Sequence, residues 1–381
     1  MKTPETFDAI RPFEPEELPE AYDRLLADSG FQAVLAYLYP GVPVEAIGAK
    51  MRQCPTSLDF QKTFCYGFLE QLLAKASKGC DMDASDINVG GRYTFVSNHR
   101  DIVLDSALLD KLLIDVGFST TCEIAIGDNL LSLPWVRDLV RVNKSFIVER
   151  SLPPRQMLMA SKRMSDYMHF AIAEKNENVW IAQREGRAKD SDDRTQPAIL
   201  KMMAMGGEGT PVERLAQLHI VPLSISYEFD PCDYLKAKEL QQRRDTADFK
   251  KAPGDDVLSM RTGIVGYKGR IHYHCAPCID DYLATLADVP KGELFDRVAA
   301  HIDREIHRHY RLYPSHLVAL DLLEGSDAHA DGYTAEDKAF FLRYLEGQLA
   351  KIQLEHPDHD FLRERMLTMY ANPARNHFAA L

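Results

Sequence analysis

A histidine and two aspartates lie close together in the stretch SNHRDIVLD, where His99 is followed by Asp101 and Asp105. Because an imidazole titrates near neutral pH, a His can take a proton from an attacking hydroxyl as a general base. A carboxylate on the second ring nitrogen fixes the tautomer and favours the imidazolium formed during proton transfer. The stretch therefore predicts general-base chemistry at His99, with Asp105 favoured as its partner and Asp101 as the alternative.

The triplet His-Arg-Asp also occurs in the catalytic loop of protein kinases, which transfer a phosphoryl group. A kinase needs an Asn five residues after this Asp, where the present chain has Ser106. The chain also lacks an Asp-Phe-Gly triplet and a G-x-G-x-x-G loop, and it has no G-x-S-x-G motif of a serine nucleophile. These absences exclude the kinase interpretation and argue against a covalent acyl-enzyme.

His99 follows the short apolar stretch YTFVS, which is typical of a buried strand, and a helical pattern begins soon after it. Strand-like segments then alternate with helical ones to about residue 280; they read CEIAIG, SFIVE, NVWIAQ, HIVPLSISYE and RIHYHC. This alternation predicts an α/β sheet layered with helices. Catalytic groups gather at the carboxyl ends of strands in such sheets, which is where His99 is expected.

Four blocks follow one another in this region: SNHRDIVLD, NKSFIVER, WIAQREGRAKD and IVPLSISYE. In this order they resemble the blocks of the glycerol-phosphate and lysophosphatidic-acid acyltransferase family. The resemblance covers about residues 90–280 and implies a mixed central sheet flanked by helices. It also implies an enzyme of phospholipid biosynthesis that moves a fatty acyl group from acyl-CoA or acyl carrier protein to a hydroxyl. The acceptor would be glycerol 3-phosphate, lysophosphatidic acid or a related lipid.

The same resemblance implies which residues bind the acceptor. Arg150 and Arg187 would hold its phosphate through bidentate, charge-assisted hydrogen bonds. Glu185 would orient Arg187 or the acceptor hydroxyl. Gly186 would let the backbone approach the substrate closely.

The sequence departs from the family pattern in two places. Five residues rather than four separate His99 from Asp105, so a wider turn must precede the helix, or Asp101 takes the role. The third block reads Arg-Glu-Gly-Arg where the family reads Pro-Glu-Gly-Thr-Arg. Other cations near this block are alternative phosphate ligands: Arg184, Lys189, Arg194 and Lys201.

Composition limits the partners and the location. The net charge of −12 argues against binding DNA or RNA, which needs a dominant basic surface. The seven cysteines indicate reduced thiols in the cytoplasm, and neither a secretory signal nor a run of about 18 apolar residues is found. We expect a cytoplasmic protein, with docking on the inner membrane face as an open alternative. No cofactor is expected besides the thioester co-substrate.

Helical patterns at both ends predict three regions: a helical N-terminal region at 1–87, the acyltransferase α/β domain at 88–285 and a helical C-terminal region at 286–381. Phe60, Phe64, Phe68 and Leu72 recur at steps of four, so they form one apolar helix face. We expect this face to pack on the next domain, with membrane contact as the alternative. The last residues, 361–381, are expected to be a packed helix with a loose tail, again with membrane docking as the alternative.

Three shorter segments complete the predictions. HYHCAPC, at 272–278, has two His and a Cys-x-x-Cys that could bind zinc, but His272 and His274 alternate along a strand without a second ligand cluster, so no metal is expected. DMDAS, at 81–85, is interpreted as a polar turn, and 243–256 as a polar surface loop. Two alternative functions stay open: an acyltransferase for another acceptor, such as an amino-acid lipid, and a non-catalytic lipid- or acyl-carrier-binding protein of the same fold.

Overall fold

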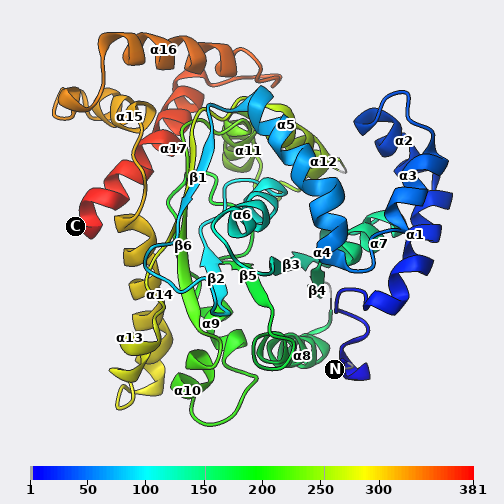
Figure 1. The fold of residues 1–381 in the computed structure, drawn as a ribbon. Helices are drawn as coiled ribbons and strands as arrows, with labels where there is room; N and C mark the ends of the chain where they lie inside the picture. Colours follow the sequence, from blue (N-terminus) through cyan, green and yellow to red (C-terminus); the bar gives the residue numbers. More distant parts are fainter. Residues whose placement is uncertain (1–2, 151, 253) are drawn as a thin grey trace.

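A seven-stranded sheet lies at the centre of the computed structural model, which describes residues 3–150, 152–252 and 254–381 (Figure 1). The strand order is β1-β7-β6-β2-β5-β3-β4. Five neighbouring pairs are parallel, and β6 and β7 pair antiparallel, which confirms the predicted mixed sheet. The strands are β1 (Cys80–Asp83), β2 (Thr94–Ser97), β3 (Cys122–Gly127), β4 (Ser145–Val148), β5 (Asn178–Ala182), β6 (Ile220–Tyr227) and β7 (Ile271–Cys275).

Side chains of the central strands alternate between two cores. Val96 of β2 and Val179 and Ile181 of β5 belong to one core, whereas Phe95 and Trp180 belong to the other. Successive side chains of a strand point to opposite faces, so this pattern is that of a sheet covered on both faces.

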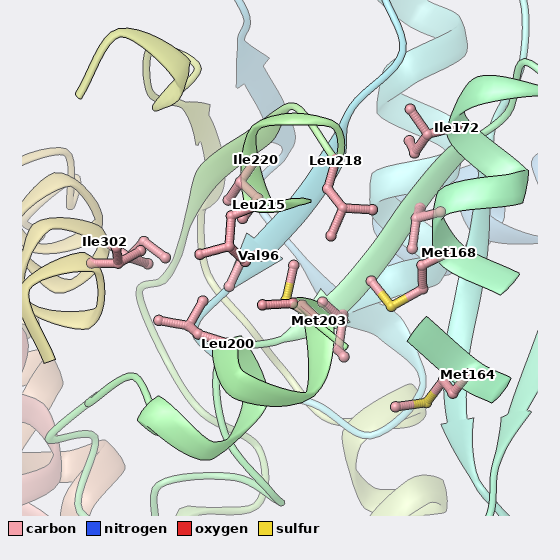
Figure 2. Close-up of a cluster of buried hydrophobic side chains, with 14 of the residues drawn as sticks. Val96, Met164, Met168, Ile172, Leu200, Met203, Leu215, Leu218, Ile220 and Ile302 are labelled. Atoms are coloured by element: carbon pink, nitrogen blue, oxygen red, sulfur yellow. The ribbon is translucent and has the colours of Figure 1, made fainter. Parts of the chain in front are cut away.

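Helices pack on both faces of the sheet. On the face of Phe95 lie α5 (Tyr66–Ala76) and α6 (Leu104–Asp115). The other face is covered by α8 (Pro154–Ala173), α9 (Pro197–Met203), α10 (Pro211–Ala216), α13 (Asp280–Ala284) and α14 (Lys291–Arg308). Figure 2 shows Met164 of α8, Met203 of α9 and Ile302 of α14 gathered with Val96 in this second core.

The N-terminal helices form a further cluster at the side of the sheet where α7 (Pro134–Val142) lies (Figure 1). They are α1 (Leu18–Ala27), α2 (Ser29–Leu38), α3 (Val44–Met51) and α4 (Ser57–Phe60). A π-helical turn, Gln61–Cys65, joins α4 to α5. Phe68 and Leu72 pack on the sheet, as predicted, whereas Phe60 and Phe64 pack in the N-terminal cluster.

The segment predicted as a polar turn at 81–85 begins instead within strand β1. Cys80 and Met82 pack toward the core of Phe95, whereas Asp81 and Asp83 alternate with them. β1 pairs with β7 at the edge of the sheet, so it needs apolar side chains on one side only. Four residues with two apolar positions are too short a pattern to distinguish from a turn. The region at 1–87 therefore contributes a strand to the sheet.

Two other segments are more ordered than predicted. α11 (Asp233–Asp245) and α12 (Asp255–Val265) shorten the loop that was predicted at 243–256. The expected loose tail is wrong, because α17 (His359–Ala380) continues nearly to the end of the chain. Leu362, Met366 and Tyr370 of α17 pack in a separate core with α15 (Pro314–Glu324) and α16 (Ala335–Leu349). Among the described residues, no helix has the length and apolar character needed to cross a bilayer.

Candidate active site

His99 and Asp105 form a hydrogen-bonded pair beyond the carboxyl end of β2. His99 Nδ1 lies 2.7 Å from Oδ2 of Asp105, which is buried in the first turn of α6. The His99 ring also packs edge-on against Trp180 of β5, with ring centroids 5.8 Å apart. Because a carboxylate oxygen accepts, this geometry assigns the ring proton to Nδ1. The Nε2 lone pair is then left to accept a proton from a bound hydroxyl.

A turn before α6 absorbs the extra residue between His99 and Asp105. Asp101 Oδ1 accepts from the backbone N–H groups of Val103 and Leu104, at 2.9 and 2.8 Å, as a capping side chain does at a helix start. Asp105 Oδ2 accepts from the backbone N–H groups of Arg100 and Asp101, at 2.6 and 3.0 Å. The Asp101 carboxylate therefore caps the start of α6, and the Asp105 carboxylate is the one that contacts His99. Burial and the neighbouring Asp105 raise the pKa of Asp101.

A cavity of about 1160 Å³ opens in front of His99. Apolar side chains from β3, α7, α8 and α9 line part of it: Ile124, Ile126, Val136, Val140, Met157, Met164, Ile199 and Met202. The rest of the lining includes six cationic side chains, Arg150, Arg184, Arg187, Lys189, Arg243 and Lys251, and five acidic ones, Glu149, Glu185, Asp190, Glu239 and Asp256. The cavity can therefore receive a ligand with a long apolar part and an anionic part.

The structure brings the sequence-predicted acceptor residues to this cavity. Arg150, Glu185, Gly186 and Arg187 all line it together with His99. Gly186 has φ +67°, in the left-handed region that favours glycine. Glu185 pairs with Arg150, whose Nη1 lies 3.3 Å from Glu185 Oε1, rather than with Arg187.

Arg187 is buried, and its Nη1 has no hydrogen-bond partner among the described residues. Buried polar groups normally have such partners, because leaving one unpaired costs free energy. Arg187 therefore brings a guanidinium with a buried, unpaired N–H to the cavity lining, close to the carboxylates of Asp101 and Asp230.

The family model named Acyltransferase matches residues 81–226, the segment from β1 through most of β6 that holds all six predicted site residues. Residues 81–226 form an acyltransferase domain. No curated protein sequence matches the chain. The chain is similar to the crystal structure of the 1-acyl-sn-glycerophosphate (LPA) acyltransferase PlsC from Thermotoga maritima. That similarity has a TM-score of 0.39 and 12% sequence identity, and it covers 77% of this chain and 94% of that chain.

Sequence reasoning missed cavity residues that follow the matched segment 81–226, although they lie within the α/β domain predicted at 88–285. Glu239 and Arg243 of α11 and Lys251 after it all line the cavity. Lys189 was expected only as an alternative phosphate ligand. It lines the cavity, and its Nζ forms an ion pair with Glu239 Oε2 at 2.7 Å. The run of Lys, Glu, Gln and Arg in α11 favours a helix, but no local pattern shows that this helix lies against the cavity.

Two other alternative phosphate ligands, Arg194 and Lys201, are not among the residues that line the cavity. Arg194 pairs with Asp192 and Asn376, and Lys201 lies over the ring of Phe295.

Residues beyond the acyltransferase domain also support its third block. Asn372 and Asn376 of α17 donate to Asp190 O and Asp192 Oδ1, at 2.8 and 3.1 Å. Asp193 binds Arg100, the neighbour of His99, at 2.7 Å and accepts from the Tyr310 hydroxyl at 2.6 Å. The C-terminal helices therefore hold the segment after Arg187, and through Asp193 they hold the turn that carries His99.

Gly263 of α12 packs directly on this turn. A Cβ at this position would overlap Asp101 Oδ2. Gly263→Ala is expected to displace the Asp101 carboxylate from its helix cap and to lower the free energy of unfolding by about 1–3 kcal/mol, as overpacking typically does. Chemical denaturation of the two proteins measures the difference.

Gly347→Ala in α16 is the matched control, because nothing lies within 4 Å of a Cβ there. It should leave stability unchanged or raise it by up to about 1 kcal/mol through helix propensity. Equal stabilities of Gly263→Ala and the wild type would contradict the close packing on Asp101.

Proposed function

We propose that the protein transfers a fatty acyl group from a thioester, acyl-CoA or acyl carrier protein, to a hydroxyl of a phosphorylated glycerol acceptor. Glycerol 3-phosphate, lysophosphatidic acid and related lipids are the acceptors of this chemistry. The observation that carries the proposal is that the His99–Asp105 pair faces a cavity with both apolar and cationic walls. The apolar side chains suit the acyl chain, and the guanidinium groups suit a phosphate.

In the proposed reaction His99 Nε2 takes the proton of the acceptor hydroxyl while the hydroxyl oxygen attacks the thioester carbonyl. The C–O bond forms, the C–S bond breaks, and the imidazolium returns its proton to the departing thiolate. Asp105, 2.7 Å from Nδ1, stabilises the imidazolium between these two transfers. A general base in this position typically contributes about 10²- to 10⁴-fold to the rate.

Arg187 and Arg150 are the proposed phosphate ligands. Arg187 supports this role through its unpaired Nη1, and Arg150 through its place on the same cavity wall. Glu185, paired with Arg150, would hold that guanidinium in place. Gly186 would allow the acceptor to approach the backbone between them.

An amphipathic acceptor would reach the cavity from a lipid surface, so we include docking on the inner membrane face in the proposal. Leu158 and Met159 of α8 support it. They are 63% and 69% exposed and lie next to the cavity residues Met157 and Ala160. Apolar side chains exposed in this way are typical of contact with a lipid surface or a partner protein.

Thiol release tests the proposed reaction. Long-chain acyl-CoA or acyl carrier protein is incubated with the protein and with glycerol 3-phosphate, lysophosphatidic acid or no acceptor. Release that depends on a phosphorylated acceptor supports the proposal and identifies the donor. Release only with a different acceptor, such as an amino-acid lipid, would overturn the acceptor assignment. Acyl-CoA binding without release would favour a non-catalytic binding protein.

Lys189 predicts a pH dependence of acceptor binding. Burial lowers the pKa of Lys189 to about 8, against the opposing effect of Glu239. Its positive charge is present below this pH and is lost above it. If Lys189 assists phosphate binding, KM for glycerol 3-phosphate should rise by up to about tenfold between about pH 7 and about pH 9. The acceptor phosphate is already fully ionised across most of this range.

Lys189→Arg keeps its charge at these pH values, so its KM should stay nearly constant over the same pH range. The measurement is KM against pH for both proteins. An equal rise in the variant would assign the pH dependence to another group.

A further inference from the structure

Three side chains from separate segments meet away from the acyltransferase cavity. They are Asp86 in the loop after β1, His274 of β7 and His309 at the end of α14. Each offers one ligand atom, and these three atoms all lie within 4.8 Å of one another. The two imidazole rings stack with centroids 4.0 Å apart and planes 10° apart, and Asp86 Oδ2 lies 3.4 Å from His274 Nε2.

The hydrogen bond of His309 leaves one ring nitrogen free as a ligand. His309 Nδ1 lies 2.7 Å from the backbone carbonyl oxygen of Glu305. A carbonyl oxygen only accepts, so the proton is on Nδ1 and the lone pair is on Nε2. Metal-binding His residues usually donate their other N–H to a carbonyl or carboxylate in this way, which orients the ring.

His274 is placed in a similar way. Its Nε2 is buried and has no hydrogen-bond partner in the described parts of the chain. Its Nδ1 lies 3.6 Å from a second carboxylate, Asp83 Oδ2, on the neighbouring strand. A buried ring nitrogen that makes no hydrogen bond, although a carboxylate lies 3.4 Å from it, needs an explanation. In metal sites, a carboxylate often lies beside the ring nitrogen that does not bind the metal, as Asp83 lies beside His274 Nδ1 here.

We propose that Asp86, His274 and His309 bind a divalent transition-metal ion, Zn²⁺ being the best match. Two imidazole nitrogens and one carboxylate oxygen form a common three-residue zinc set, with water in the fourth position. Bonds of about 2.0–2.1 Å place the ligand atoms of a tetrahedral site about 3.3 Å apart. The three ligand atoms lie within 4.8 Å of one another, so binding would require the two stacked rings to tilt toward the ion.

The charges around the cluster favour a cation. Asp83 and Asp86 both face His274, and Glu305 lies beside His309. Two nearby cations are paired with carboxylates: Arg311 with Asp81 at 2.9 Å and Arg308 with Glu305 at 3.5 Å.

A bound ion would join the loop after β1, strand β7 and the end of α14. His309 directly precedes Tyr310, whose hydroxyl binds Asp193, three residues after the third block. The ion is therefore a structural element that fixes α14 on the sheet edge, and its binding should raise the melting temperature of the protein.

Zinc titration of the full-length protein, after removal of metal with a chelator, tests the site. Calorimetry should show a bound Zn²⁺ whose affinity falls at least about tenfold in Asp86→Asn, His274→Gln and His309→Gln. Asp86→Asn is decisive if the His variants unfold, because Asp86 is exposed and a change there spares the core. His272→Gln is the matched control, since His272 lies on the same strand but pairs with Asp81.

A second group, His219, Cys278 and Asp280, also has ligand atoms in reach of one another, so the two groups must be distinguished. Co²⁺ at the proposed site gives d–d bands without a thiolate charge-transfer band, whereas Co²⁺ bound by Cys278 gives both. Unchanged zinc affinity and unchanged melting temperature in folded Asp86→Asn would overturn the proposal. A thiolate band that accounts for all the bound Co²⁺ would do so too.

Discussion

His99→Ala is expected to lower acceptor-dependent thiol release by about 10²- to 10⁴-fold while the protein stays folded. The substitution removes the nitrogen that takes the hydroxyl proton, and His99 lies at the surface of the cavity rather than in the core. The loss should appear in kcat, because the imidazole acts in the transition state rather than in binding. Steady-state thiol release by the two proteins, with melting temperatures measured alongside, gives the result.

His356→Ala is the control, since the His356 side chain is 92% exposed and its Nε2 lies 4.0 Å from Glu355 Oε1. Asp105→Asn should also lower kcat, because it weakens the orientation of the His99 ring. The double variant of His99 and Asp105 should be no slower than His99→Ala alone, since Asp105 acts through His99. A rate of His99→Ala within about threefold of the wild type would assign the general base elsewhere.

Arg187→Ala is expected to raise KM for the phosphorylated acceptor by about 10- to 150-fold, the equivalent of about 1.5–3 kcal/mol for a lost charged hydrogen bond. Its buried Nη1 has no partner among the described residues, so a bound phosphate would satisfy it. Arg187→Lys keeps the charge but loses the bidentate geometry. Its KM should therefore lie between those of the wild type and Arg187→Ala. Initial rates over a range of acceptor concentrations give these values.

Arg194→Ala is the matched control, because Arg194 is an arginine of the same region that pairs with Asp192 and Asn376 instead. Its KM should equal that of the wild type. If Arg187→Ala raised KM equally for an acceptor without a phosphate, the assignment of Arg187 to the phosphate would be wrong.

Much of the fold was predictable because its signals are local. Strands β2 to β7 are buried or alternate clearly, and each was identified from its own residues. The place of His99 followed from the strand before it and the helix after it. The meeting of Arg150 and Arg187 with His99 came from the resemblance of four blocks, and the cavity lining places all three together. Their roles in acyl transfer stay proposals for the experiments above.

The rest depended on contacts that no local pattern contains. Glu239 and Arg243 reach the cavity because α11 packs against α16 and α17, which a polar sequence does not reveal. The cluster of Asp86, His274 and His309 joins residues that are far apart in the chain, and in sequence His274 appears only beside His272 and two cysteines. Its ligands are visible only after β1, β7 and α14 have come together.

The bonds from α17 to the segment after Arg187 have a consequence for the order of folding. Asn376 and Arg194 are 182 positions apart in the chain. Closing a loop of this length costs about 2 kcal/mol more in chain entropy than closing one of about 20 residues. Contacts with such long separations form late, after the local helices and neighbouring strands. The cavity wall that holds Arg187 should therefore become ordered late, together with the pairing of β1 and β7, whose paired residues Cys80 and Ile271 are 191 positions apart.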